Sequence, residues 1–284
     1  MKDFPRTTVG GVSLPRLIMG SNWLLGYSHT TASAGEYIWQ VNGSVAAMSQ
    51  IACSYLENGI DAIVVPYNPG ERCEILLAGL KDAEDKTGRK IIKIFTYSPD
   101  VADTKEARKS AEDYTKHVKE KGADFLFVFH SKVEELLDKH TKRIDRLPDY
   151  LYMIRENQMI PGLSAHMPEV VIYADQNEYD VESYIQIYNC MGFLMQVEIE
   201  YIHKVIWAAK KPVMAIKPMA AGRVTPFVGL TFAYATLREE DMVVCGAFTP
   251  KEAAEDAEIS LAAIERRPPG TEGRPSPEKT SIMK

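Results

Sequence analysis

Short apolar runs alternate with longer amphipathic segments along most of this chain. Seven or eight such runs end in small or polar residues before the next amphipathic stretch begins. A short, fully apolar run is typical of a buried parallel strand, whereas amphipathic spacing is typical of a helix packed on one face. The runs lie at residues 17–20, 62–65, 90–96, 125–129, 161–164, 183–188, 212–217 and 242–245. Their alternation predicts an α/β protein that closes into a (β/α)8 TIM barrel.

The segments around these runs predict a hairpin, the helices and the ends of the domain. Gly10 and Gly11 lie between β-forming residues of segment 7–13, which predicts an N-terminal β-hairpin. Helices are expected over residues 37–58, 71–86, 104–121, 133–139, 147–157, 168–174, 198–210 and 251–266. We expect a single barrel domain over residues 1–266. Residues 267–284 are rich in Pro, Gly, Ser and charge, which predicts a disordered tail.

The length and composition of the chain limit the kinds of binding partner that we expect. A TIM barrel needs about 250 residues, and the chain has 284. The net charge is −6 with no basic stripe, so we expect a small-molecule substrate and no nucleic-acid partner. No run approaches the roughly 18 apolar residues of a membrane span, and no apolar signal segment follows the N-terminus. The four cysteines are scattered without a CxxC pair, so we expect a reduced, cytoplasmic protein. The sequence gives no signal for the oligomeric state.

Two histidines directly follow apolar runs. His130 closes the run at 125–129, and His166 follows the run at 161–164. In a TIM barrel, the residues at the C-terminal ends of the strands carry the chemistry. His130 and His166 are therefore expected at the functional site.

The order and spacing of four motifs resemble the aldo-keto reductase superfamily. The motifs are the strand that ends in His130, Gly162-Leu-Ser-Ala-His166, Gln186-Ile-Tyr-Asn189 and Ile216-Lys-Pro-Met-Ala-Ala-Gly222. The resemblance covers nearly all of residues 7–266. It implies a TIM barrel that reduces a carbonyl compound with NAD(P)H and a tetrad of Asp, Tyr, Lys and His. In that tetrad the Tyr gives a proton to the carbonyl, Lys and Asp lower its pKa, and His orients the carbonyl.

Most of that tetrad is missing from this chain. Only His130 matches, because Val64 stands at the position of the Asp, Pro69 at that of the Tyr and Tyr97 at that of the Lys. A tyrosine without such neighbours has a pKa near 10, which is a poor match to a neutral working pH. We therefore expect an altered proton-transfer group, with Tyr97 or Tyr67 acting beside His130.

The resemblance also implies contacts with cofactor and substrate. Two residues match the contacts with the nicotinamide amide, two flank the loop near the pyrophosphate, and one opens the helix near the adenosine phosphate. These are Ser164 and Gln186, Lys217 and Arg223, and Thr249. Asn22, Trp23 and His166 are expected to line the substrate site. Glu252 near the adenosine phosphate would repel a 2′-phosphate, which makes NADP the less favoured nucleotide.

Two alternatives stay open beside the oxidoreductase. His29, His130 and His166 come from three different strand ends and could converge on a metal ion, although their spacing is not a local ligand motif. The missing tetrad favours a repurposed barrel, which would be a metal-assisted or cofactor-free lyase, isomerase or hydrolase acting on a sugar-like substrate. A non-catalytic binding subunit would also fit. Fold analogy does not choose among these functions.

Overall fold

Eight parallel strands close into a barrel in the computed structural model, which describes residues 3–271. The strands pair in the order β10-β11-β12-β3-β4-β5-β6-β9, and β9 also pairs with β10. Their bounds are β3 (Leu17–Gly20), β4 (Ala62–Pro66), β5 (Ile92–Tyr97), β6 (Phe125–Val128), β9 (Ile160–Ala165), β10 (Ser183–Ile187), β11 (Val213–Ile216) and β12 (Met242–Cys245). The prediction of a single-domain (β/α)8 barrel is confirmed.

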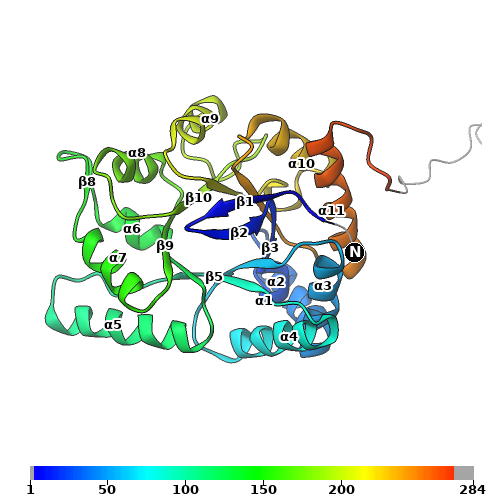
Figure 1. Ribbon diagram of the computed structural model, residues 1–284, viewed down its shortest axis with the longest axis horizontal. Helices are drawn as coiled ribbons and strands as arrows, with labels where there is room; N and C mark the ends of the chain where they lie inside the picture. Colours follow the sequence, from blue (N-terminus) through cyan, green and yellow to red (C-terminus); the bar gives the residue numbers. More distant parts are fainter. Residues whose placement is uncertain (1–2, 272–284) are drawn as a thin grey trace, which may run out of the picture.

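Helices surround the barrel (Figure 1). They are α3 (Val45–Glu57), α4 (Glu71–Thr87), α5 (Lys105–Glu120), α7 (Leu147–Glu156), α8 (Pro168–Gln176), α9 (Ile199–Ala208), α10 (Pro226–Thr236) and α11 (Pro250–Glu265). Three of them begin at a hydroxyl cap, because the side chains of Ser44, Thr104 and Thr249 accept hydrogen bonds from backbone N–H groups of the first turn. These caps place the helix starts where the polar residues of the sequence lie.

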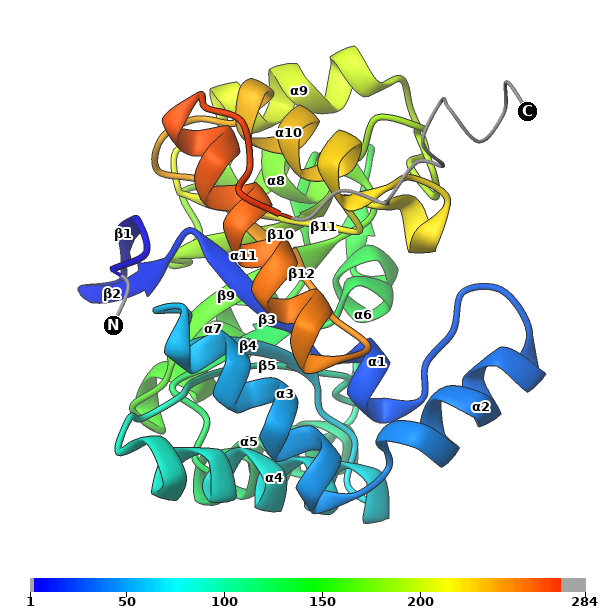
Figure 2. The same ribbon diagram turned by 90° about the vertical axis from the view of Figure 1, so that its right-hand side faces the viewer.

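The predicted N-terminal hairpin closes one end of the barrel. It consists of β1 (Arg6–Val9) and β2 (Val12–Pro15), and the turn residues Gly10 and Gly11 have φ values of 54° and 82°. This left-handed conformation favours glycine. Val9 and Leu14 pack with the apolar side chains of the barrel lumen. Figure 2 shows the hairpin at one end of the molecule and helices α1 (Asn22–Leu25) and α2 (Ala32–Asn42) at the other.

Side chains alternate between the lumen and the helices along each strand. In β4, Ala62 and Val64 belong to the lumen cluster, whereas Ile63 and Val65 belong to the larger core between barrel and helices. The lumen is tightly filled. A Cβ atom on Gly162 would lie 2.4 Å from the ring of Phe127, so glycine is required for that ring to fit.

Three helical predictions were wrong in detail. The helix expected over residues 37–58 is two helices, because the chain breaks at Gly43 and Ser44 caps the second one. Between β11 and β12, α10 was not expected, since its apolar residues surround the whole helix and give no amphipathic period. The region 133–157 also contains α6 (His130–Glu135) and a short hairpin of β7 (Leu137–Asp138) and β8 (Arg143–Ile144).

The predicted tail lies mostly outside the described residues, since residues 272–284 are beyond them. Its first residues contact α11: the Arg267 guanidinium donates to Glu258 and Glu265, and the Gly270 N–H donates to Glu258. Within residues 3–271, no helix is both long enough and apolar enough to cross a lipid bilayer.

Candidate active site

A cavity of about 980 Å³ opens at the C-terminal ends of the strands, opposite the hairpin. Residues that follow β3, β4, β6, β9, β11 and β12 line it. The predicted site residues among them are Asn22, Trp23, His29, Tyr67, His130, Ser164, His166 and Lys217. Within residues 3–271, the cavity lining contains no Asp or Glu. The cavity therefore favours a ligand that presents oxygen acceptors or negative charge.

Lys217 brings the main positive charge to this cavity. It follows the last residue of β11 and has a φ of 60°, a left-handed conformation that few non-glycine residues adopt. Strand alternation would direct Lys217 toward the helices, as it does Val213 and Ala215, and the left-handed backbone ends that alternation. Burial lowers the pKa of Lys217 to about 8. In the described part of the chain, no carboxylate pairs with its ammonium group.

His29 holds the Lys217 ammonium group. Its Nε2 lies 2.9 Å from Lys217 Nζ and 3.3 Å from Asn22 Nδ2. The ammonium group can only donate, so Nε2 must be the acceptor and the proton of the neutral ring must be on Nδ1. Burial, together with the charges of Lys217 and Arg223, lowers the pKa of His29. His29 is therefore a neutral acceptor near pH 7.

His130 and His166 form a stacked pair in the cavity wall. Their ring centroids lie 3.6 Å apart and the ring planes differ by 17°. Burial and the Lys217 charge lower the pKa of His130 to about 4. Burial and the neighbouring His130 lower that of His166 to about 3. Both rings are neutral near pH 7, and their nitrogens make no hydrogen bond to another group of residues 3–271. They are free to contact a ligand.

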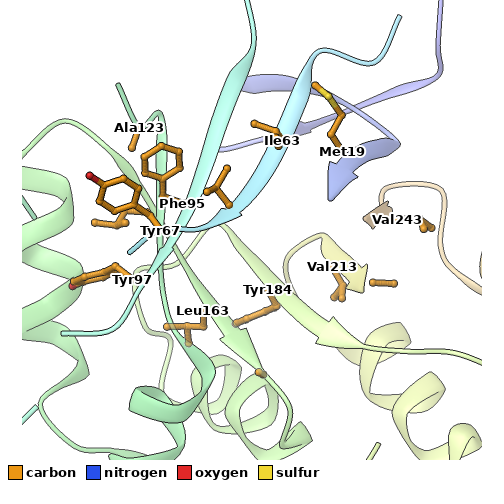
Figure 3. Close-up of a cluster of buried hydrophobic side chains, with 14 of the residues drawn as sticks. Met19, Ile63, Tyr67, Phe95, Tyr97, Ala123, Leu163, Tyr184, Val213 and Val243 are labelled. Carbon is orange, nitrogen blue, oxygen red and sulfur yellow. The ribbon is translucent and has the colours of Figure 1, made fainter. Parts of the chain in front are cut away.

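Neither Tyr67 nor Tyr97, the tyrosines predicted for proton transfer, presents a free hydroxyl to the cavity. Figure 3 shows both in the core with Phe95. Tyr97 is fully buried, stacks on Tyr114 at 5.7 Å and does not reach the cavity. Tyr67 borders the cavity, but its hydroxyl lies 3.0 Å from His117 Nε2 and burial raises its pKa to about 12. Both residues have the strand parity that points toward the helices rather than the lumen.

Only one of the two expected nicotinamide contacts lies in the cavity wall. Ser164 has the lumen parity of Gly162 and lines the cavity. Gln186 has the opposite parity, is fully buried and does not line the cavity, and its Nε2 donates to the backbone oxygen of His166 at 3.4 Å. Gln186 Oε1 has no hydrogen-bond partner within residues 3–271. The side chains of Ser164 and Gln186 therefore lie on opposite faces of the barrel wall, and of the two only Ser164 is placed to contact a ligand in the cavity.

Arg223 and Thr249, which were expected near the phosphates, make contacts within the protein. The Arg223 guanidinium lies 4.1 Å above the Phe193 ring and donates to the Ala220 oxygen, outside the cavity lining. The Thr249 hydroxyl caps α11, and the Glu252 carboxylate accepts from the Phe248 N–H at 2.7 Å. That carboxylate already satisfies the positive end of the helix. The cavity wall thus contains Ser164, whereas Arg223 and Thr249 make contacts within the protein and the start of α11 already has a carboxylate on it.

The structure gives no support to the hypothesis of a histidine metal site. Among the described residues, no group of three or more His, Cys, Asp or Glu side chains is placed to hold a metal ion. The stacked rings of His130 and His166 lie face to face, while His29 accepts from Lys217.

Sequence reasoning missed two features of the site. Lys217 was assigned only to the pyrophosphate loop, although a lysine that directly follows an apolar strand is a signal for a barrel-mouth residue. Its contact with His29, which is 188 positions away in the chain, gives no sequence signal. Trp23 was expected at the substrate site, but Tyr37 and Phe248, which complete an aromatic wall with it, were missed; the Phe248 ring lies 5.4 Å from that of Trp23 and 6.0 Å from that of Tyr37.

Comparison with known proteins identifies the fold. No protein-family model and no curated protein matches the sequence. A provisionally assigned aldo-keto reductase from Pseudomonas aeruginosa superposes with a TM-score of 0.65 at 13% identity, over 92% of this chain and 97% of that one. An aldo/keto reductase from Klebsiella pneumoniae, in complex with NADP and acetate, superposes with a TM-score of 0.54 at 14% identity, over 95% and 92%. At these identities the similarity shows the fold alone, and the predicted likeness to the aldo-keto reductases is confirmed at that level.

Proposed function

We propose that this barrel is a nicotinamide-linked oxidoreductase that reduces a small, sugar-like carbonyl compound at the barrel mouth. The observation that carries the proposal is the combination of Lys217, without a carboxylate partner, and two imidazoles with free nitrogens in a cavity whose described lining has no acid. A carbonyl oxygen gains negative charge during reduction. Fixed donors and a cation around that oxygen stabilise the charge most effectively where water is partly excluded.

The nucleotide and the substrate would occupy different walls of the cavity. Ser164 would hold the carboxamide of the nicotinamide, and the bound dihydronicotinamide would supply the hydride. The carboxylate of Glu252 at α11 favours NADH over NADPH. The aromatic faces of Trp23 and Phe248, with the amides of Asn22 and Asn68 nearby, suit a polyhydroxy substrate. All four cysteines are unpaired, which supports the expected cytoplasmic location.

Titration calorimetry of the purified protein with NADH and NADPH tests this proposal. We expect NADH to bind more tightly than NADPH. We also expect Ser164→Ala to weaken NADH binding about tenfold, which corresponds to the loss of one hydrogen bond. Ser110→Ala on the exposed face of α5 is the matched control and should change nothing. Absence of binding by either nucleotide would refute the proposal, whereas binding without turnover of any carbonyl would favour a binding subunit.

A cofactor-free lyase or isomerase is the second candidate, and one observation favours it. The Lys217 amine has no carboxylate partner, lies half-buried and has a pKa lowered to about 8, which makes it available to condense with a carbonyl. An enzyme of this kind would need no nucleotide, and the displaced Arg223 and capped α11 would then have no phosphate to contact.

A further inference from the structure

We propose that the Lys217 ammonium group is the proton donor to the substrate carbonyl and that His29 holds it in position. The inference rests on the proposed carbonyl reduction and assigns the step that the absent tyrosine would perform. It changes Lys217 from a phosphate contact, as the sequence suggested, to a catalytic residue.

Geometry places the ammonium group where a carbonyl oxygen would bind. Lys217 directly follows β11, in the wall of the cavity at the C-terminal ends of the strands. His29 Nε2 accepts one of its three N–H groups at 2.9 Å. Two N–H groups remain for the cavity. The left-handed backbone at Lys217, which is unfavourable for a non-glycine residue, keeps the side chain away from the helices.

The tyrosines and histidines predicted for this site are poorer donors than Lys217. The Tyr67 hydroxyl is engaged by His117, and Tyr97 does not reach the cavity. His130 and His166 are neutral near pH 7, so neither carries a proton that it can readily release. A donor works best when its pKa lies close to the working pH. Of these groups, Lys217 has the pKa closest to neutral.

The step balances in atoms and charge. When hydride supplied by a bound dihydronicotinamide forms a C–H bond at the carbonyl carbon, the electron pair of the C=O π bond moves to the oxygen, which takes a proton from Lys217 Nζ. An N–H bond breaks, an O–H bond forms, and Lys217 becomes a neutral amine. Water at the open mouth of the cavity then returns the proton. His29 is a positioning residue in this scheme, since it touches Lys217 and not the reacting atoms.

Competitive labelling tests the amine without substrate or nucleotide. The rate at which acetic anhydride modifies each lysine is followed against pH by peptide mass spectrometry. We expect the Lys217 midpoint near 8 and well below that of the exposed Lys109, which serves as the internal control. The groups that face Nζ are His29, His130 and His166, which stay neutral over this range, and the Arg223 guanidinium acts on His29. A Lys217 midpoint close to that of Lys109 would overturn the proposal.

Kinetics with NADH and glyceraldehyde test the proton transfer. We expect Lys217→Met and Lys217→Arg each to lower kcat at least about 100-fold while NADH affinity stays within about threefold. Arginine keeps the charge but holds its proton too tightly to donate it. Lys109→Met is the matched control. The wild-type kcat should fall above about pH 8, and His29→Ala should shift that limb while His29→Gln, which retains an acceptor, restores it.

Three results would each refute a different part of the proposal. Activity retained in Lys217→Arg would show that only charge is needed, and the donor role would be wrong. A covalent adduct of glyceraldehyde on Lys217, trapped by cyanoborohydride without nucleotide, would make Lys217 a nucleophile and support the lyase instead. Failure of NADH to bind wild-type protein, with the labelling midpoint still near 8, would refute the proposed reduction and not the unusual lysine.

Discussion

Replacing Asp256 with asparagine should stabilise this protein, although the residue is buried. Asp256 lies in α11 with 3% of its surface exposed and faces β12, where the Cys245 thiol donates to its Oδ2 at 3.2 Å. No cation pairs with it among the described residues, and Glu252 and Glu255 lie nearby. Burial, aided by these two carboxylates, raises its pKa from 3.8 to about 7. The thiol contact opposes the shift but does not cancel it.

Proton linkage gives the direction in which the free energy of unfolding changes with pH. Because the folded pKa is raised, the native state binds this proton more tightly than the unfolded chain does. The contribution of Asp256 to the free energy of unfolding is therefore most favourable below pH 3.8 and declines as the pH rises to about 7. The full decline corresponds to about 4 kcal/mol. Asparagine matches the shape of the acid, accepts from Cys245 and never ionises, so it removes the penalty.

Urea unfolding of wild type and Asp256→Asn at pH 4 and pH 8 measures this effect. We expect the variant to be more stable by up to about 4 kcal/mol at pH 8 and by less than about 1 kcal/mol at pH 4. Asp113→Asn removes an exposed carboxylate that pairs with Lys109 at 3.0 Å, and it should change stability by under about 1 kcal/mol at both pH values. Equal or lower stability of the Asp256 variant at pH 8 would refute the reasoning.

Two further substitutions follow from contacts in the barrel. Gly162→Ala should destabilise the protein by about 1–3 kcal/mol in thermal unfolding, because the new methyl group meets the Phe127 ring at 2.4 Å. Phe127→Leu in the same chain should recover part of that loss, and additive effects of the two changes would contradict the clash. Glu252→Gln should improve NADPH binding relative to NADH, since it removes the charge at the start of α11; an unchanged ratio in calorimetry would show that the 2′-phosphate lies elsewhere.

The barrel was predictable from sequence because each strand is a short apolar run between polar segments. Both Leu17–Gly20 and Met242–Cys245 were predicted at their observed bounds. Period-two alternation, continued past each run, gives Tyr97 the parity of the buried Phe95 and places Ser164 and Gln186 on opposite faces of the barrel wall. The burial of Tyr97 was therefore within reach of the sequence.

Other parts of the site could not have been predicted from sequence. The contact between His29 and Lys217 joins a loop after β3 to the end of β11, and no local pattern links them. The left-handed backbone of Lys217 contradicts its strand parity, so counting would have placed it wrongly. The stacking of His130 on His166 depends on how α6 and the loop after β9 meet. Such features arise from tertiary packing, which overrides local preference at functional sites.

The hairpin at the base of the barrel also bears on how ligands enter and leave the cavity. Val9 and Leu14 pack beneath the apolar side chains that fill the lumen, at the end of the barrel opposite the cavity. Ligands therefore reach Lys217 from the mouth of the cavity, which residues of α2 border, and leave by the same side. Two ligands that share one passage obstruct each other, so the one seated deeper has to arrive first and depart last. The hairpin on the far side of the molecule does not contact the site, yet by closing that end of the barrel it affects the order in which two ligands bind there.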